Sequence, residues 1–145
     1  MRKRSLISTL TILLTLATLA ACASASSSSP DVLIEYRRTG GFAGFDDHLV
    51  IYKDGNAILT RQEQQSEFSI SPDTLLHLED LFSQADFSDL RSEYTPDRQV
   101  ADVFEYVISY QGKRVRAMDT AIPPELFPLI QALNQIVDTG RGSIS

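Results

Sequence analysis

The chain has little of the side-chain chemistry that disulfide frameworks, redox sites and most metal sites require. Its 145 residues include one cysteine, Cys22, and two histidines, His48 and His77. A single cysteine cannot form an intrachain disulfide, and it excludes the paired-cysteine motifs of zinc and redox sites. A domain without disulfides has to be stabilised by its hydrophobic core. We therefore expect no disulfide, no metal and no cofactor.

Catalytic motifs are also missing. The many serines lack a Gly-x-Ser-x-Gly elbow, which would expose one of them as a nucleophile. The glycine-rich residues 40–44 are not followed by the Lys-Ser/Thr pair of a phosphate-binding loop. Asp46, Asp47 and His48 are three metal-capable residues in a row, but consecutive strand residues point to opposite faces and cannot converge on one ion. We interpret them as solvated residues that open a strand, and we expect a protein that is not an enzyme.

The start of the chain has the three parts of a secretory signal. Basic residues 2–4 precede an apolar run at residues 6–19, and small residues precede Cys22. The run is shorter than the roughly 20 residues of a membrane-spanning helix, and it contains several serines and threonines. The sequence Leu19-Ala20-Ala21-Cys22 resembles the lipobox of bacterial lipoproteins, whose signal is removed before the cysteine and whose cysteine is then acylated. A permanent span and an ordinary signal peptide are the alternatives.

This resemblance divides the chain into four parts. Residues 1–21 are the expected signal peptide, and residues 22–30 are the expected lipidated Cys22 with a Ser/Ala-rich tether. Residues 31–138 are the expected domain, and residues 139–145 the expected flexible tail. The resemblance also implies export from the cytoplasm and a lipid anchor in the cell membrane or the outer membrane. Because Ala23 replaces the aspartate that the lipoprotein family associates with inner-membrane retention, the outer membrane is favoured in a cell with two membranes.

The charge of the mature chain limits its partners. Removal of residues 1–21 takes three basic residues away and leaves 10 basic against 19 acidic residues, a net charge of −9. Nucleic acids and anionic lipid surfaces select for basic proteins. We therefore expect no nucleic-acid partner, and membrane attachment through the lipid alone.

The first half of the domain has the signals of a strand and a hairpin. Residues 32–40 alternate in a pattern typical of a half-buried strand. Two β-rich runs at residues 49–60 flank Asp54-Gly55, a strong signal for a two-residue hairpin turn. A two-residue turn would place Ile51 opposite Ile58.

The second half predicts two helices and a further hairpin. Polar residues 62–67 are expected to form a loop, and a helix is expected from Ser71-Pro72 to about residue 84. A hairpin is expected at residues 102–119, followed by a helix opened by Pro123-Pro124-Glu125. The element order predicts an α+β domain with about five antiparallel strands and two helices packed on one face.

The faces of the second hairpin differ in polarity. Its inward face is expected to be apolar, and its outward face carries Arg114, Arg116 and Met118. One core face and one wet face are common in antiparallel sheets.

The loop after the first strand combines glycines with aromatic residues. Glycines allow backbone angles that other residues avoid, while two phenylalanines are large apolar groups for a surface connection. We expect either that one ring packs under the sheet, or that the loop protrudes and inserts an aromatic anchor into a partner. The candidate binding residues are Gly40, Gly41, Phe42, Ala43, Gly44 and Phe45.

Several ordered motifs resemble the emfourin family of protealysin-inhibitor-like proteins. They are residues 38–44 (Arg-Thr-Gly-Gly-Phe-Ala-Gly), 85–87 (Ala-Asp-Phe), 101–106 (Ala-Asp-Val-Phe-Glu-Tyr) and the proline-opened last helix. Emfourins are small inhibitors of thermolysin-like metallopeptidases. The hairpin at residues 49–60 and the lipoprotein signal are additions to the short inhibitors.

Three functions follow from these features. The first is a lipid-anchored, non-enzymatic protein-binding module, for which the resemblance implies inhibition of a thermolysin-like metallopeptidase. The second is an accessory or structural envelope lipoprotein that holds a protein partner on the wet sheet face. The third is a small-ligand binder, which would require a concave pocket with convergent polar groups.

Overall fold

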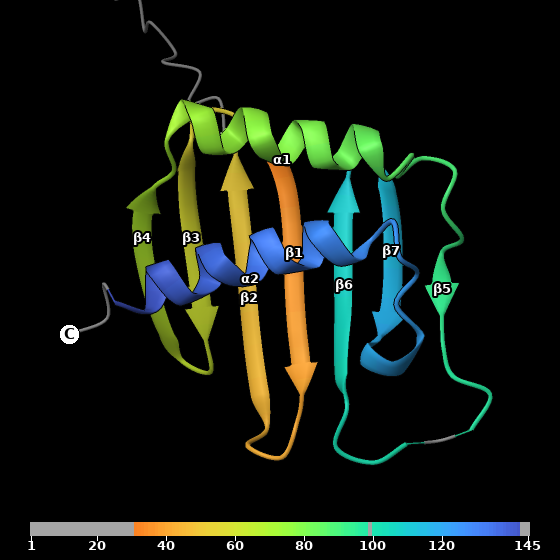
Figure 1. The fold of residues 1–145 in the computed structure, drawn as a ribbon. Helices are drawn as coiled ribbons and strands as arrows, with labels where there is room; N and C mark the ends of the chain where they lie inside the picture. The colour runs from red at the N-terminus through yellow and green to blue at the C-terminus, as the bar shows by residue number, and fades with distance from the viewer. Residues whose placement is uncertain (1–30, 99, 143–145) are drawn as a thin grey trace, which may run out of the picture.

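The computed structural model describes residues 31–98 and 100–142 as one α+β domain (Figure 1). The predicted signal, Cys22 and the tether lie outside the described residues. In chain order the elements are β1 (Val32–Gly40), β2 (Phe45–Tyr52), β3 (Asn56–Arg61), β4 (Gln64–Ser69), α1 (Pro72–Gln84), β5 (Glu93–Tyr94), β6 (Phe104–Tyr110), β7 (Lys113–Met118), the short 3-10 helix η1 (Asp119–Ala121) and α2 (Phe127–Arg141). Neither α-helix is long and apolar enough to cross a membrane.

The strands form one sheet in the order β4-β3-β2-β1-β6-β7-β5. Both helices lie across the same face of this sheet (Figure 1), as the sequence predicts. The predicted single α+β domain with two helices is confirmed, but the sheet differs from the expected one of about five antiparallel strands in two ways. The sheet has seven strands, and β5 runs parallel to β7, so the sheet is mixed.

The fourth strand occupies residues that the sequence assigns to a loop. In β4 the inward positions are Ser66, which is buried, and Phe68, which packs against the core. The Ser66 hydroxyl donates to the carbonyl oxygen of Gly140 over 3.2 Å. The other residues are polar because β4 is an edge strand that pairs only with β3. Because most of its residues are polar, β4 lacks the alternation of apolar residues that predicts a strand from the sequence.

The fifth strand is only two residues long. Glu93 and Tyr94 pair with Arg116 and Ala117, and the Arg116 N–H donates to the Ser92 carbonyl over 2.9 Å. A two-residue strand leaves no periodic signal in the sequence, because its pairing depends on a strand that follows more than twenty residues later.

The register of the β2–β3 hairpin differs from the prediction by one residue. Ile51 pairs with Ala57, and Ile58 pairs with Val50. The turn uses three residues because Gly55 has a φ of +87° and donates its N–H to the Tyr52 carbonyl over 3.0 Å. A type I turn followed by a residue with positive φ is the common three-residue hairpin connection.

The helices supply the second layer of the core. The side chain of Ser71 caps α1 by accepting from the Thr74 N–H over 3.1 Å, as predicted. The predicted start of α2 at Pro123 is wrong, because the helix begins at Phe127. The predicted tail is also partly wrong, since the helix continues to Arg141. The apolar residues of one side of α2, together with the preceding Leu126, are buried against the sheet: Leu129, Ile130, Leu133, Ile136 and Val137.

Candidate functional site

Four connecting segments lie along the end of the sheet at which β1 terminates. Antiparallel pairing places the end of β1, the start of β2, the end of β3, the start of β6 and the end of β7 at this end. We call it the hairpin edge, because the β1–β2 connection (residues 41–44, the tip) lies there between its neighbours (Figure 1). The other connections at this edge are residues 62–63, the described parts of 95–103, and η1.

The tip is a short turn with a fixed backbone. The Gly44 N–H donates to the Gly41 carbonyl over 3.0 Å, and the Gly41 N–H donates to the Val103 carbonyl over 3.2 Å. Gly40 has a φ of +100°, and a Cβ at this position would overlap the Val103 carbonyl oxygen. Only glycine fits there, so the sequence motif reflects close contact between the hairpin and the segment before β6.

The two phenylalanines of the predicted loop have different roles. Phe42 is 95% exposed, more than the other large exposed apolar residues among the described positions. Phe45 is partly buried at the first position of β2, where its ring centroid lies 5.6 Å from that of Phe104. Phe45 thus packs inward, as the first alternative from the sequence expects, while Phe42 projects from the tip between Gly41 and Ala43.

A network of three arginines around one carboxylate supports the base of the hairpin. We call Asp47 with Arg38, Arg61 and Arg141 the arginine cluster. The fully buried Asp47 carboxylate accepts from Arg38 over 2.6 and 3.1 Å, from Arg61 over 2.7 and 3.2 Å, and from Arg141 over 3.1 Å. The same three guanidinium groups lie 5.2–5.6 Å from the centre of the Phe45 ring. The cluster therefore joins β1, β2, β3 and α2 directly behind the tip.

Asp138 and the dipole of α2 partly offset the charge of the arginine cluster, in which three arginines face the one carboxylate of Asp47. Burial raises the pKa of Asp47, but hydrogen bonds from Arg61 and Arg38 and the charges of both guanidinium groups outweigh burial, so the pKa of Asp47 lies below its ordinary value. Arg141 also pairs with Asp138 over 3.0 Å and sits in the last turn of α2, where the helix dipole favours a cation.

The network extends inward through Asn134. Its side-chain oxygen accepts from the Tyr36 hydroxyl and from Arg38, each over 2.8 Å. Burial raises the pKa of Tyr36 far above its ordinary value, so Tyr36 stays a neutral donor. Burial and the neighbouring Asp119 raise the pKa of Tyr106 to about 12. Tyr36 and Tyr106 therefore both stay protonated, as is typical of residues with a structural role.

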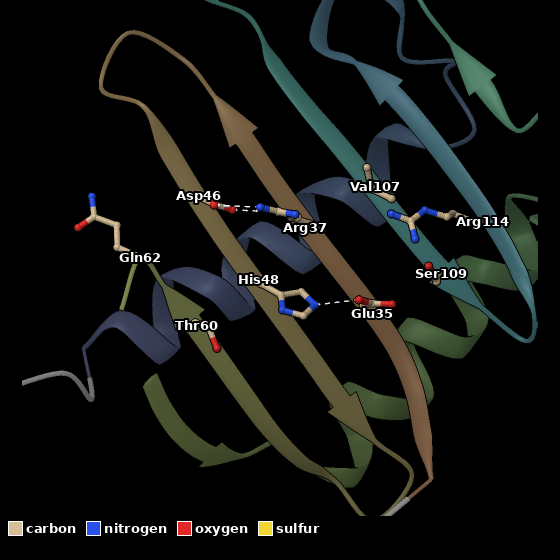
Figure 2. Close-up of a pocket in the computed structure, with 9 residues that line it drawn as sticks. All are labelled: Glu35, Arg37, Asp46, His48, Thr60, Gln62, Val107, Ser109 and Arg114. Atoms are coloured by element: carbon tan, nitrogen blue, oxygen red, sulfur yellow. Dashed lines mark hydrogen bonds and ion pairs between the residues drawn. The ribbon is translucent and has the colours of Figure 1, made fainter. Parts of the chain in front are cut away.

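The second candidate surface is the open face, the sheet face opposite the helices (Figure 2). Its side chains form ion pairs between neighbouring strands. Arg37 pairs with Asp46 over 2.9 Å, and His48 contacts Glu35 over 2.9 Å. A depression of about 300 Å³ lies over these pairs and extends to Thr60 and Arg114. It is shallow and mostly polar, unlike the enclosed apolar pockets that hold most small ligands.

Arg114, Arg116 and Met118 lie on the open face, as predicted from the alternation of β7. Arg116 is committed to Glu93 and Glu105, over 2.6 and 2.5 Å. The hydrogen bond from Arg116 lowers the pKa of Glu105 from its ordinary value. Of the two arginines, Arg114 is the more exposed.

The alternation expected for Asp46, Asp47 and His48 is confirmed, but the interpretation of all three as solvated residues is wrong for Asp47, which is fully buried because three arginines supply its hydrogen bonds. Asp46 and His48 lie on the open face, while Asp47 points to the helix side. Within residues 31–98 and 100–142, no three His, Cys, Asp or Glu residues are grouped to hold a metal ion. His77 is exposed on α1.

The sequence reasoning missed the arginine cluster, although a signal for it was present. Arg38 continues the buried alternation of Ile34 and Tyr36, and Asp47 continues that of Leu49 and Ile51. Opposite charges at core positions of neighbouring strands indicate a buried ion pair. Arg141 could not have been found in this way, because it is 94 residues from Asp47.

Comparisons with family models, curated proteins and solved structures find no match for this chain.

Proposed function

We propose that the protein is a lipid-anchored, non-enzymatic protein-binding module that contacts its partner through the tip of the β1–β2 hairpin. The observation that carries this proposal is Phe42, a large apolar side chain that is 95% exposed on a turn with a fixed backbone. Aromatic side chains contribute much of the binding energy of protein interfaces.

The rigidity of the hairpin base supports a binding role for the tip. A loop that is already ordered loses less conformational entropy when it binds than a mobile loop does. The arginine cluster, Phe45 and Phe104 hold the base of the hairpin, and the contact of Gly41 with Val103 holds its side. The turn that carries Phe42 is therefore held at its base before the partner arrives.

The proposed partner class is a thermolysin-like metallopeptidase, which the protein would inhibit as emfourins do. This choice depends on the resemblance of residues 38–44 and 101–106 to that family. In the structure these two motifs are neighbours, because Gly40 pairs with Phe104 and the Gly41 N–H donates to Val103. Two of the four motifs that carry the resemblance thus lie side by side at the hairpin edge.

The test uses the chain from residue 22 with Cys22→Ser and a thermolysin assay with a fluorogenic peptide. We expect inhibition by this chain, and a loss of at least about 30-fold in affinity for Phe42→Ala, as for an interface hot spot. Leu76→Ala is the matched control, because Leu76 is also a large apolar residue that is 60% exposed, but on α1. No inhibition at micromolar concentration would exclude the peptidase target, and equal inhibition by Phe42→Ala would exclude the tip.

A second candidate is an envelope accessory lipoprotein that binds a partner on the open face. Within the described residues no helix covers this face, and the exposed Arg114 borders its depression. In that case the purified chain with Phe42→Ala should bind the partner with wild-type affinity. The chain with Arg114→Glu should lose this binding. Because Arg116 is held by two glutamates, Arg114 is the better position for this test.

A further inference from the structure

The arginine cluster carries more positive charge than its acidic partners neutralise. Its three guanidinium groups all contact the single carboxylate of Asp47. The one other acid paired with the cluster within the described residues is Asp138, which contacts Arg141 over 3.0 Å and is 60% exposed. Three cations and two carboxylates leave one positive charge without a partner.

The cluster also has more hydrogen-bond donors than its partners accept. Each guanidinium carries five N–H groups. Arg61 contacts Asp47 through Nε and Nη2, which leaves its Nη1 for another acceptor. The Nε of Arg141 is buried and has no hydrogen-bond partner among the residues that the structure describes. Buried donors are nearly always paired in proteins, so an unpaired one indicates that the cluster can take a further acceptor.

A small hollow beside the tip opens onto the cluster. Its volume is about 170 Å³, several times the roughly 30 Å³ of one water molecule. It is lined by Ala43, Gly44, Phe45, Asp46, Arg61 and Gln62. Arg61 is its one basic residue and is 26% exposed, so a ligand in the hollow can reach it. The one acid of the lining, Asp46, is already paired with Arg37 through hydrogen bonds of 3.0 and 2.9 Å.

We propose that this hollow binds an oxyanion group, a carboxylate or a phosphate, through the guanidinium group of Arg61. The charges of Arg38 and Arg141 lie behind Arg61, around the same Asp47 carboxylate, and favour an anion there. Guanidinium groups match carboxylate and phosphate oxygens in geometry as well as in charge. The inference goes beyond the proposed function, because the site requires neither Phe42 nor a protein partner.

NMR of the arginine side chains tests the site directly. The Nε–H signals of the 15N-labelled Cys22→Ser chain from residue 22 are followed while sodium phosphate or sodium acetate replaces sodium chloride at constant ionic strength. We expect a saturable shift of the Arg61 signal with a Kd of about 1 mM for the better of the two ions. The ion that binds more tightly identifies the group as a phosphate or a carboxylate. Arg116 is the internal control, because it is 41% exposed but paired with Glu93 and Glu105.

Two charge variants of the same shape locate the site without disturbing the core. Gln62→Glu places a fixed carboxylate in the lining of the hollow and should weaken binding of the ion at least about tenfold. Gln84→Glu makes the same change at an exposed position of α1, which crosses the sheet near its other end (Figure 1), and should change the Kd less than about twofold.

Three results would overturn the inference. They are no saturable shift of Arg61 with either ion up to about 20 mM, an equal shift of Arg116, or equal effects of the two variants. The peptidase assay is independent of this experiment, so inhibition of thermolysin without binding of an oxyanion would reject this site and retain the proposed function.

Discussion

Asp47→Asn is expected to destabilise the domain strongly. The substitution keeps the shape of the side chain and removes the charge that accepts five hydrogen bonds from three guanidinium groups. Asp47 is fully buried, and breaking a buried ion pair costs about 3–5 kcal/mol, because the remaining charges lose their partner. A domain of this size has a free energy of unfolding of about 5–15 kcal/mol, so the loss is a large fraction of the total.

Urea denaturation of the Cys22→Ser chain from residue 22 measures this loss. With a slope of about 2 kcal/mol per molar urea, a loss of about 4 kcal/mol lowers the midpoint by about 2 M. Asp46→Asn is the matched control, because Asp46 is the preceding residue and also pairs with an arginine. Its pair with Arg37 is about half exposed on both sides, and exposed pairs contribute about 0–1 kcal/mol. If Asp47→Asn lowered the free energy of unfolding by less than about 1 kcal/mol, or no more than Asp46→Asn, the assigned role of the arginine cluster would be refuted.

Three further predictions concern the domain around the hairpin. Gly140→Ala should lower the urea midpoint, although replacing glycine by alanine stabilises most helices, because the new Cβ would lie 2.6 Å from the Phe68 ring. A higher midpoint would contradict the packing of α2 on β4. Gly40→Ala should lower the free energy of unfolding by about 1–3 kcal/mol in the same assay, because Gly40 has a positive φ and contacts the segment before β6. An unchanged midpoint would show that this contact does not persist in solution. Because the pKa of Asp47 is lowered on folding, its stabilisation is complete above the unfolded pKa of about 3.9 and is lost as the pH falls through the lower folded pKa. The free energy of unfolding should therefore fall below about pH 4, with a shallower fall in Asp47→Asn, and parallel curves for the two chains would exclude this linkage.

The sequence predicts those parts of the fold whose signals come from residues close together along the chain. Ser71 and Pro72 mark the start of α1, and the expected faces of the hairpin at residues 102–119 are confirmed in β6 and β7. The strands that it does not predict depend on partners far along the chain. β4 is polar because it is an edge, and β5 exists only through its pairing with β7.

The candidate site could be predicted in the same partial way. The glycines and phenylalanines at residues 40–45 indicate an unusual surface loop, and Phe45 shares the inward alternation of Asp47 and Leu49 in β2. Alternation does not predict the position of Phe42, which precedes β2, or the approach of Arg38 and Arg61 to the Phe45 ring. The contacts of Arg38 and Arg61 with the Phe45 ring join β1, β2 and β3. The position of Arg61 in β3 depends on the register of the β2–β3 hairpin, which is predicted from the sequence with an error of one residue.

The direction of β1 sets the distance between the start of the domain and the tip. The domain begins at Val32, at one end of the strand, and the tip follows Gly40 at the other end. Eight steps of about 3.3 Å separate these two residues by about 26 Å. Under the proposed lipid anchor, the tether would join the domain at the end of the sheet that carries Val32, and Phe42 would lie at the other end. Membrane attachment and partner binding would then use opposite ends of the domain, so they would not compete.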